Sequence, residues 1–429
     1  MRTNARKIAY ELLFSWEKDK TFPNLALKNA LRTVEDQRDR RFITALVYGV
    51  VEKKITLDHF LNQCLTNQRL EPTARCILRM GLYQMFYMDT PSAAACDTSV
   101  ELTKQLGLHR YTGLVNAVLR RCDRERETML LLKKADFSVR YSISPVLVDL
   151  LLEQYGKENF VSMMEGIQQV DSSMYLYHNH KKGTAKSFVD LMKTEGIDLQ
   201  ETEIPHLYRS LNGFTPEHST AYKAGLYHIV SPHSAEAASL LPSESETILD
   251  LCAAPGGKTF ILASNTHQTV YSFDIHSHKV RLLEQEATRL GHTNVVATLN
   301  DGTVPMTQWQ QKADFVLCDV PRSGLGMMGK KPDIKYKEYD SSYFTAIQTS
   351  ILENGASYLK NGGRLVYSTC TIDRRENEEL IKSFLNNHPQ FALDDTVLDR
   401  GEKRYLPGVG SDGFYIAVLK RVCELETGY

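Results

Sequence analysis

The stretch Cys252-Ala253-Ala254-Pro255-Gly256-Gly257-Lys258-Thr259 decides the fold of the carboxyl-terminal part. It follows an apolar run and opens a helical pattern, so it reads as a small-residue turn between a strand and a helix. Glycines let the backbone approach a ligand closely, and a helix amino terminus offers free N–H groups. The Gly-Lys-Thr ending resembles a triphosphate loop, but that loop needs glycine where Cys252 stands, and the spaced dinucleotide fingerprint is also missing. We therefore expect a ligand-binding turn of another kind, or else a purely structural turn.

Short apolar runs alternate with helical stretches from residue 247 onward. The runs that we predict to be strands are Thr247–Cys252, Val270–Ile275, Asn294–Leu299, Ala313–Val320 and Arg364–Thr369. This alternation predicts an α/β fold, with a mostly parallel, doubly wound sheet covered by helices on both faces. Ligands of such sheets bind at the carboxyl ends of the strands, so the residues at those ends are candidate site residues.

Acidic residues stand at the ends of the second and third predicted strands. Asp274 ends the second strand, where an acid can bind both hydroxyls of a ribose. Asp301 follows the third strand, where it could accept a hydrogen bond from an adenine amino group. A single Asp at either place would more often cap a turn. Two in register after the glycine-rich turn predict an adenosyl ligand.

The first 130 residues are predicted to be helical. Two sets of apolar positions recur at the spacing of one helix face, Ala9, Leu12, Leu13 and Trp16, and then Phe42, Ala45, Leu46 and Gly49. The prolines of this part, Pro23, Pro72 and Pro91, fall where helices should start or stop. Residues 172–230 are predicted to form short strands around a helix at 184–195, which makes them a small α/β connector.

Charge is unevenly distributed along the chain. The formal net charge is −1, but residues 1–130 hold 21 Lys and Arg against 15 Asp and Glu, while the remainder holds 30 against 37. A basic amino-terminal part fits a module that binds phosphate groups. A solvated helical surface would show the same excess, so charge alone leaves both interpretations open.

Composition excludes several other classes of protein. The apolar content of 42% supports packed cores rather than disorder. We find neither a secretion signal nor an apolar stretch long enough to span a membrane. The eight Cys show no CxxC pair, so we expect reduced thiols and neither a disulfide framework nor a metal site. These features predict a cytoplasmic protein, which we expect to be a monomer.

The last two predicted strands end in motifs that resemble a known family. The fourth gives Asp319-Val320-Pro321-Arg322-Ser323-Gly324 and the fifth gives Ser368-Thr369-Cys370-Thr371. With the octet at 252–259, in this order, they resemble the RNA cytosine-5 methyltransferase family, whose catalytic domain is a Rossmann-like class I methyltransferase fold. Residues 1–123 resemble the RNA-binding domain of NusB, notably at 77–84 and 115–121. This pairing is similar to the bacterial methyltransferase B family, which acts on 16S ribosomal RNA.

The resemblance implies a cofactor, a mechanism and a division of the chain. It implies that S-adenosyl-L-methionine is held by Cys252, Ala253, Ala254, Pro255, Gly256, Gly257, Lys258, Asp274, Asp301 and Asp319. Cys370 matches the nucleophile that adds to C6 of cytosine, and Asp319 matches the acid that hydrogen-bonds the base, while Lys258 is implied to stabilise the thiolate or the developing charge. A small buried residue is the alternative for Cys370. The expected domains are 1–130 (NusB-like), 131–230 (connector) and 231–429 (methyltransferase).

Two departures from the family pattern affect the expected activity. The family usually has a second Cys, implicated in product release, where this chain has Arg322, and residues 230–234 lack the usual Gln-Asp or Gln-Glu pair. Because arginine binds phosphate well, we expect Arg322 to position the RNA substrate. Arg120 and Arg121 are further candidates for RNA binding. Two alternatives stay open, the same chemistry on transfer RNA and an RNA-binding protein with weakened catalysis.

Overall fold

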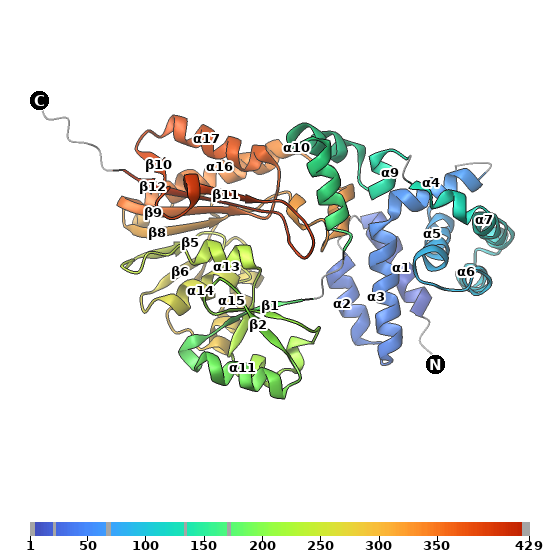
Figure 1. Cartoon of the computed structure of the whole chain (residues 1–429), viewed down its shortest axis with the longest axis horizontal. Coiled ribbons are helices and arrows are strands. Elements are labelled where there is room, and N and C mark those ends of the chain that lie inside the picture. Colours follow the sequence, from blue (N-terminus) through green and yellow to red (C-terminus); the bar gives the residue numbers. More distant parts are fainter. Residues whose placement is uncertain (1–4, 20–22, 66–69, 133–134, 170–172, 423–429) are drawn as a thin grey trace, which may run out of the picture. The chain divides into compact units, whose positions relative to one another are not determined.

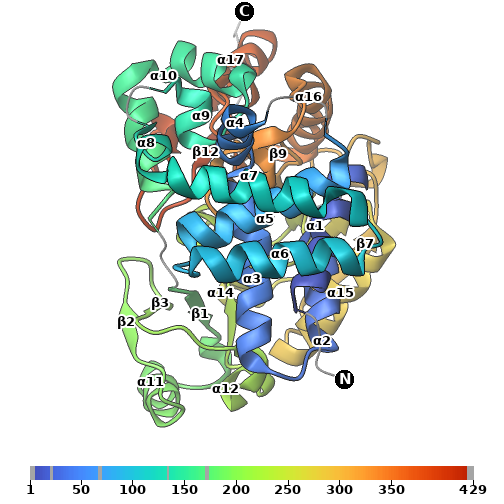
Figure 2. The same ribbon diagram turned by 90° about the vertical axis from the view of Figure 1, so that its right-hand side faces the viewer.

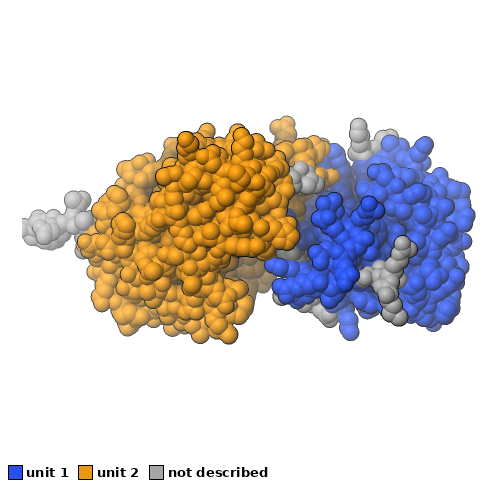
Figure 3. Space-filling view, turned by 90° about the horizontal axis from the view of Figure 1, so that it is seen from below, with its two compact units in different colours: residues 1–156, 330–339 blue, residues 157–329, 340–429 orange. Residues whose placement is uncertain are grey.

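The computed structural model describes residues 5–19, 23–65, 70–132, 135–169 and 173–422. The chain forms two compact units, shown in different colours in Figure 3. Unit 1 consists of residues 1–156 and 330–339, and unit 2 consists of residues 157–329 and 340–429.

Unit 1 is helical. Its helices are α1 (Ala5–Asp19), α2 (Pro23–Arg32), α3 (Gln37–Glu52), α4 (Lys54–Cys64), α5 (Pro72–Tyr87), α6 (Ser92–Gln105), α7 (Thr112–Arg124), α8 (Arg126–Met129), α9 (Phe137–Tyr141) and the first half of α10 (Pro145–Gly166). Helices α6 and α7 lie side by side (Figure 2). Helix α10 is interrupted at Gly156, whose φ of 73° is a conformation that favours glycine.

The predicted helix starts are confirmed. Pro23 and Pro72 are the first residues of α2 and α5, where a missing N–H costs nothing, and Pro91 directly precedes α6. The residues predicted to form the buried face of α1 are buried. Of the residues predicted to form the buried face of α3, one is wrong. Ala45 is exposed, and the buried residues of α3 are Ile43, Leu46, Val47, Gly49, Val50 and Val51. The cause is that this helix is apolar over more than one face, so periodicity alone does not fix its rotation.

A segment far along the sequence completes unit 1. Residues 330–339 contain the short 3₁₀ helix η7 (Pro332–Tyr336), whose Lys335 ammonium donates to the carbonyls of Glu52 at 3.0 Å and Tyr141 at 3.2 Å. The Tyr336 hydroxyl donates to the same Glu52 carbonyl at 2.7 Å. Residues more than 180 positions apart in the sequence are therefore bonded within one unit.

The first part of unit 2 is a small sheet with a helix on it. Its strands are β1 (Tyr175–His178), β2 (Leu199–Glu201), β3 (Leu207–Ser210) and β4 (Tyr227–Ile229), in the antiparallel order β2-β3-β1-β4. Helix α11 (Ala185–Thr194) packs on it through Phe188 and Met192, and the short α12 (Thr220–Lys223) precedes β4. The α/β character expected for this region is confirmed.

The rest of unit 2 is built on a second, larger sheet. Its strands are β5 (Ile248–Asp250), β6 (Val270–Asp274), β7 (Val295–Leu299), β8 (Ala313–Asp319), β9 (Leu359–Thr369), β10 (Phe391–Leu393), β11 (Glu402–Tyr405) and β12 (Phe414–Arg421). The order is β10-β12-β9-β8-β5-β6-β7, with β11 paired to β12. Neighbours from β9 to β7 are parallel, and β10, β11 and β12 add antiparallel pairs. All five predicted strands are present.

Helices cover both faces of the larger sheet, as Figure 1 shows. Helices α13 (Pro232–Ala238), α14 (Gly257–Asn265) and α15 (Ser277–Leu290) cover one face, and α16 (Ser341–Tyr358) and α17 (Glu378–Asn387) cover the other. Within β8, Phe315 and Leu317 join the core beneath α13 and α14, while Val316 and Cys318 join the core beneath α16 and α17. The predicted doubly wound sheet is therefore confirmed.

No helix in the described part of the chain is long and apolar enough to cross a membrane.

Candidate active site

The octet at 252–259 forms the connection from β5 to α14. Gly256 has a φ of 107°, and a Cβ at this position would lie 2.3 Å from the Phe260 ring and 2.7 Å from Leu283. Glycine is therefore required here both by conformation and by space. The Ala253 N–H donates to the Phe273 carbonyl at 2.8 Å, which ties the turn to the neighbouring strand β6. The turn lies where the strand order reverses beside β5, the usual place for a ligand in such a sheet.

Asp250, at the end of β5, is a buried acid that sequence reasoning missed. The Thr259 hydroxyl donates to Asp250 Oδ2 at 2.7 Å. Burial raises the pKa of Asp250 to about 7, against the opposing effects of Thr259 and Lys258. The available signal for this residue was an acid within the otherwise apolar run predicted at 247–252.

Asp274 and Asp301 both bind the turns that follow their strands. Asp274 Oδ1 accepts from the His276 N–H at 3.0 Å, and Asp301 Oδ1 accepts from the Thr303 N–H at 2.9 Å. Because β6 and β7 are parallel neighbours, the two acids lie at the same edge of the sheet. Each caps a turn, as a single Asp would, and each has a second carboxylate oxygen that can face a ligand.

The residues at this edge fit an adenosyl cofactor. The Asn300 side-chain oxygen is buried and accepts no hydrogen bond from the described residues, so it offers an acceptor beside Asp301. Asp274 is only 6% exposed at the end of β6. The α14 amino terminus adds free backbone N–H donors, and Gly256, which has no side chain, lets a ligand approach the backbone closely.

The buried Lys258 forms an ion pair with the partly buried Asp319. Lys258 Nζ lies 2.8 Å from Asp319 Oδ2 and also donates to the Ser234 hydroxyl at 3.1 Å. The Ser368 hydroxyl donates to Asp319 Oδ1 at 2.9 Å. Burial by itself would raise the pKa of Asp319, but the charges of Lys258 and Arg322 outweigh it and lower that pKa. Asp319 is therefore an ionised acceptor at neutral pH.

Cys370 follows β9 and is only 7% exposed. Arg322, in the turn after β8, donates through Nε to Cys370 Sγ at 2.9 Å. Burial by itself would lower the pKa of Arg322, but Cys370 and Asp319 raise it above its ordinary value, so this side chain stays a cation. The fold thus places a thiol, a carboxylate and the Arg322 cation at the ends of two adjacent strands, and Lys258 of α14 reaches the same carboxylate.

Glu376 holds the two site turns together, a role that sequence reasoning did not assign. Its carboxylate accepts from the Ser323 N–H at 3.1 Å, from the Ser323 hydroxyl at 2.5 Å and from the Gln348 amide at 2.8 Å. Asn377 holds the loop after β9, because its amide donates to the Thr371 carbonyl at 3.0 Å. The sequence signal was the pair of polar residues at 376 and 377, a few positions after the Ser-Thr-Cys strand end.

Arg120 and Arg121 belong to α7 of unit 1, whereas Cys370, Asp319 and Arg322 belong to unit 2. Arg120 is exposed and donates to Asn116 Oδ1 at 2.9 Å. Arg121 pairs with Glu125 at 3.0 Å and donates to the Cys64 carbonyl at 3.3 Å. Arg120 therefore has the more accessible charge.

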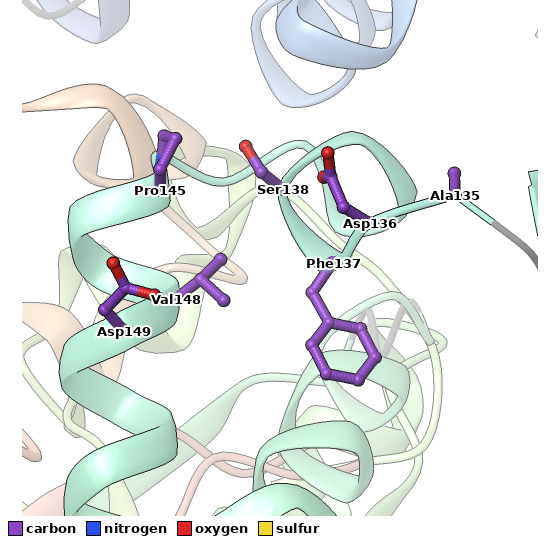
Figure 4. A pocket seen from close by; sticks show the side chains of 7 residues that line it. All are labelled: Ala135, Asp136, Phe137, Ser138, Pro145, Val148 and Asp149. Carbon is purple, nitrogen blue, oxygen red and sulfur yellow. The ribbon is translucent and has the colours of Figure 1, made fainter.

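Two pockets in unit 1 are lined by residues other than those of the cluster at the strand ends, and the larger of the two, of about 740 Å³, includes Arg120 in its lining. The other pocket, of about 370 Å³ (Figure 4), is lined by Ala135, Asp136, Phe137, Ser138, Pro145, Val148 and Asp149, which include no predicted site residue. Among the described residues, no group of His, Cys, Asp and Glu side chains is arranged to hold a metal ion.

Comparison with known proteins connects the two parts of the chain. Residues 237–420 match the family described as 16S rRNA methyltransferase RsmB/F, and residues 3–124 match the NusB family. A Bacillus subtilis protein named probable ribosomal RNA small subunit methyltransferase B is 33% identical, over 98% of this chain and 99% of its own length. This chain belongs to the RsmB/F family. The RsmB/F membership confirms the resemblance seen in the sequence, and S-adenosylmethionine is the cofactor of this RsmB/F methyltransferase.

Other relatives and solved structures agree with this RsmB/F assignment. The ribosomal RNA small subunit methyltransferase B of Vibrio cholerae is 30% identical over 92% of this chain and 93% of its own. The crystal structure of PH0851 matches with a TM-score of 0.77 at 22% identity, over 98% of this chain and 99% of that one. NSun6 from Pyrococcus horikoshii matches with a TM-score of 0.58 at 18% identity, over 66% of this chain and 99% of that one. These two structures support the fold alone.

Proposed function

We propose that this protein transfers a methyl group from S-adenosylmethionine to C5 of a cytosine in 16S ribosomal RNA. The observation that carries the proposal is the cluster at the ends of β8 and β9, where Cys370, Asp319, Lys258 and Arg322 meet. The full-length relatives carry the name of small-subunit ribosomal RNA methyltransferases, which favours ribosomal RNA over transfer RNA.

Cys370 is proposed to be the nucleophile. Cytosine C5 is a weak nucleophile, and a thiolate that adds to C6 moves electron density onto C5. Bound S-adenosylmethionine would supply the electrophilic methyl group, held by the octet at 252–258 with Asp274, Asp301 and Asp319. Cys370 is only 7% exposed and joins the apolar core on one face of the sheet, but its sulfur also accepts a hydrogen bond from the Arg322 guanidinium at 2.9 Å, a contact that packing alone does not require.

Asp319 and Lys258 are proposed to orient the base and balance charge. The ionised Asp319 carboxylate can accept a hydrogen bond from the base, and it is held in place by Ser368 and Lys258. The Lys258 ammonium carries a positive charge next to the place where negative charge develops. With all these groups present, we favour an active enzyme over an RNA-binding protein with weakened catalysis.

We propose that RNA binds to both parts of the chain. The separate family matches at 3–124 and 237–420 support a NusB-like domain at 1–130 and a methyltransferase domain at 231–429, joined by a connector at 131–230, although residues 131–156 and 330–339 pack within unit 1. Because a base must leave its stack to reach a buried thiol, an unpaired or looped cytosine is the expected target. We also propose that the protein is a monomer and acts in the cytoplasm, where ribosomes are assembled.

Replacing Cys370 tests the proposed chemistry. Cys370→Ala should abolish 5-methylcytosine formation on 16S ribosomal RNA that lacks the modification, while calorimetry shows unchanged S-adenosylmethionine binding. The matched variant Cys96→Ala, in the helical unit, should keep full activity. RNA carrying 5-fluorocytosine should become covalently attached to the native protein, because fluorine blocks the proton loss that precedes thiol release. An active Cys370→Ala variant would overturn the mechanism.

A further inference from the structure

The contact between Arg322 and Cys370 is built into the strand pairing. Strands β8 and β9 are parallel neighbours, with Asp319 opposite Ser368, so the residues three and two positions further on emerge at the same edge. The Arg322 Nε lies 2.9 Å from the Cys370 sulfur. The turn that carries Arg322 is fixed by Glu376 through Ser323, so the contact does not depend on a free loop.

A guanidinium is an unusual partner for a thiol. It remains protonated at every physiological pH, so Arg322 can donate to the sulfur but cannot accept a proton from it. Its charge interacts more favourably with a thiolate than with a neutral thiol. The residue that interrupts the family motif is therefore suited to stabilise the anionic form of the proposed nucleophile.

Other titratable groups of the neighbouring elements face this contact. They are Lys258 from α14, Asp319 from β8, Glu376 from η8 (Arg374–Glu376) and Cys252 from the β5–α14 turn. Asp319 is ion-paired with Lys258, and Glu376 is hydrogen-bonded to Ser323 and Gln348. Among these groups, Arg322 is the cation that touches the sulfur.

We propose that Arg322 is a catalytic residue that holds Cys370 as a thiolate before attack and stabilises the same thiolate when it leaves. This inference rests on the proposed function and adds a role for a residue that the family motif does not contain. It replaces substrate positioning, our expectation from the sequence, as the main task of this side chain.

The positive charge of Arg322 acts both when the bond between sulfur and C6 forms and when it breaks. On addition, the thiolate electron pair forms the bond from sulfur to C6 and the C5–C6 π electrons shift toward C5. The electron pair at C5 then forms the bond to the methyl group, whose former bond to the sulfonium sulfur would break, with its electrons staying on that sulfur as the neutral thioether leaves. On release, solvent water or hydroxide removes the C5 proton of the methylated adduct. The electrons of that C–H bond restore the C5–C6 double bond, and the pair of the C6–S bond returns to sulfur. Arg322 stabilises the sulfur anion that this release creates, while the base is water and not the guanidinium.

Alkylation of Cys370 without RNA tests the proposal. The full-length protein is treated with iodoacetamide from pH 5 to 9, and modification of the peptide containing Cys370 is followed by mass spectrometry. Arg322→Gln should slow this alkylation about tenfold at pH 7 and move its rise to higher pH, whereas Arg322→Lys should restore most of the native rate because it keeps the charge. Arg281→Gln, which removes an exposed charge from α15, serves as the matched control and should leave the profile unchanged.

Two further readouts separate the possible outcomes. Single-round methylation should slow in Arg322→Gln by a factor similar to that of alkylation, with unchanged RNA affinity. An unchanged alkylation profile in Arg322→Gln, or a loss confined to RNA affinity, would overturn the thiolate role and favour phosphate binding. If the native protein forms neither 5-methylcytosine nor the 5-fluorocytosine adduct, the proposed function fails, whatever the alkylation profile.

Discussion

Asp274 has a structural role at the start of α15 and a proposed role in cofactor binding. Its Oδ1 accepts from the His276 N–H at the start of α15, and its Oδ2 lies 3.6 Å from Lys279 Nζ. A carboxylate held in this way presents a fixed acceptor at the end of β6. Removing it should therefore affect both the start of the helix and the cofactor.

We expect Asp274→Ala to weaken S-adenosylmethionine binding by about 1–3 kcal/mol, the usual loss when a buried hydrogen-bonding partner is removed. Titration calorimetry measures this change. Asp340→Ala is the matched control, because Asp340 caps α16 through the Ser342 N–H at 2.9 Å but is not a proposed cofactor ligand. Equal cofactor affinity in the native protein and the Asp274 variant would refute the assignment.

Site residues were predictable where a motif marks a strand end. The end positions of Asp274, Asp319 and Cys370 follow from periodicity and the direction of the strands. Glu376 was not assigned a role, because its partner Ser323 is 53 positions away and only the fold brings them together. The sulfur contact of Arg322 was equally hidden, since it depends on the pairing of β8 with β9.

At the scale of elements, the small connector sheet contains two buried histidines, His178 and His228. His178 of β1 is 1% exposed and stacks on Phe188 with ring centroids 4.7 Å apart. Neither of its ring nitrogens has a hydrogen-bond partner among the described residues. Burial lowers the pKa of His178 to about 4, and burial also lowers the pKa of His228 in β4 to about 3.

These histidines should make the protein sensitive to acid. An unfolded histidine has a pKa near 6.5, so between pH 6.5 and about 4 the unfolded chain binds more protons than the folded one, and stability falls as the pH falls. His178→Phe keeps the stacking and removes two unpaired nitrogens. We expect it to raise the free energy of unfolding by about 1 kcal/mol at pH 7, and by up to about 1.4 kcal/mol more for each pH unit below 6.5.

Urea unfolding of the two proteins at pH 7 and pH 5 measures the difference. The control His218→Gln changes an exposed histidine of the same region and should not alter the pH dependence. If His178→Phe loses as much stability on acidification as the native protein, the buried ring is not the cause.

Elements were predictable when their pattern had one dominant period. The five strands of the larger sheet fit the predicted runs because buried parallel strands are short and continuously apolar. The rotation of α3 was not predictable, because Ile43, Leu46 and Val47 make it apolar beyond a single stripe. The connection from Gly156 into the second half of α10 depends on a left-handed glycine that the helical pattern does not reveal.

At the scale of the whole molecule, the chain is not divided into contiguous pieces. Residues 330–339 belong to unit 1 although both flanking segments belong to unit 2. Burial lowers the pKa of Lys335 in this segment to about 8, and its ammonium is held by the Glu52 and Tyr141 carbonyls. A sequence pattern read along the chain cannot show such an insertion, because these contacts join residues far apart in the sequence.

This insertion decides how the RNA-binding role of the helical unit should be tested. Deleting residues 1–130 would remove Glu52 and expose the 330–339 segment, so any loss of RNA binding could come from misfolding. Point substitutions on α7 avoid this problem. Arg120 is exposed there, while the charge of Arg121 is partly neutralised by Glu125.

We expect RNA affinity to fall with salt, because Lys and Arg displace counterions from phosphate groups. Arg120→Gln should lower RNA affinity and reduce the slope of log affinity against log salt by about 0.7–0.9, the value for one lost phosphate contact. Arg121→Gln should have a smaller effect, because its charge is already paired with Glu125. Lys382→Gln, an exposed charge on α17, is the control and should leave the slope unchanged. Fluorescence anisotropy with a ribosomal RNA fragment measures the slopes over a range of salt concentrations. RNA affinity depends strongly on salt between about 50 and 200 mM. Identical slopes for the native protein and both α7 variants would place the RNA contacts elsewhere.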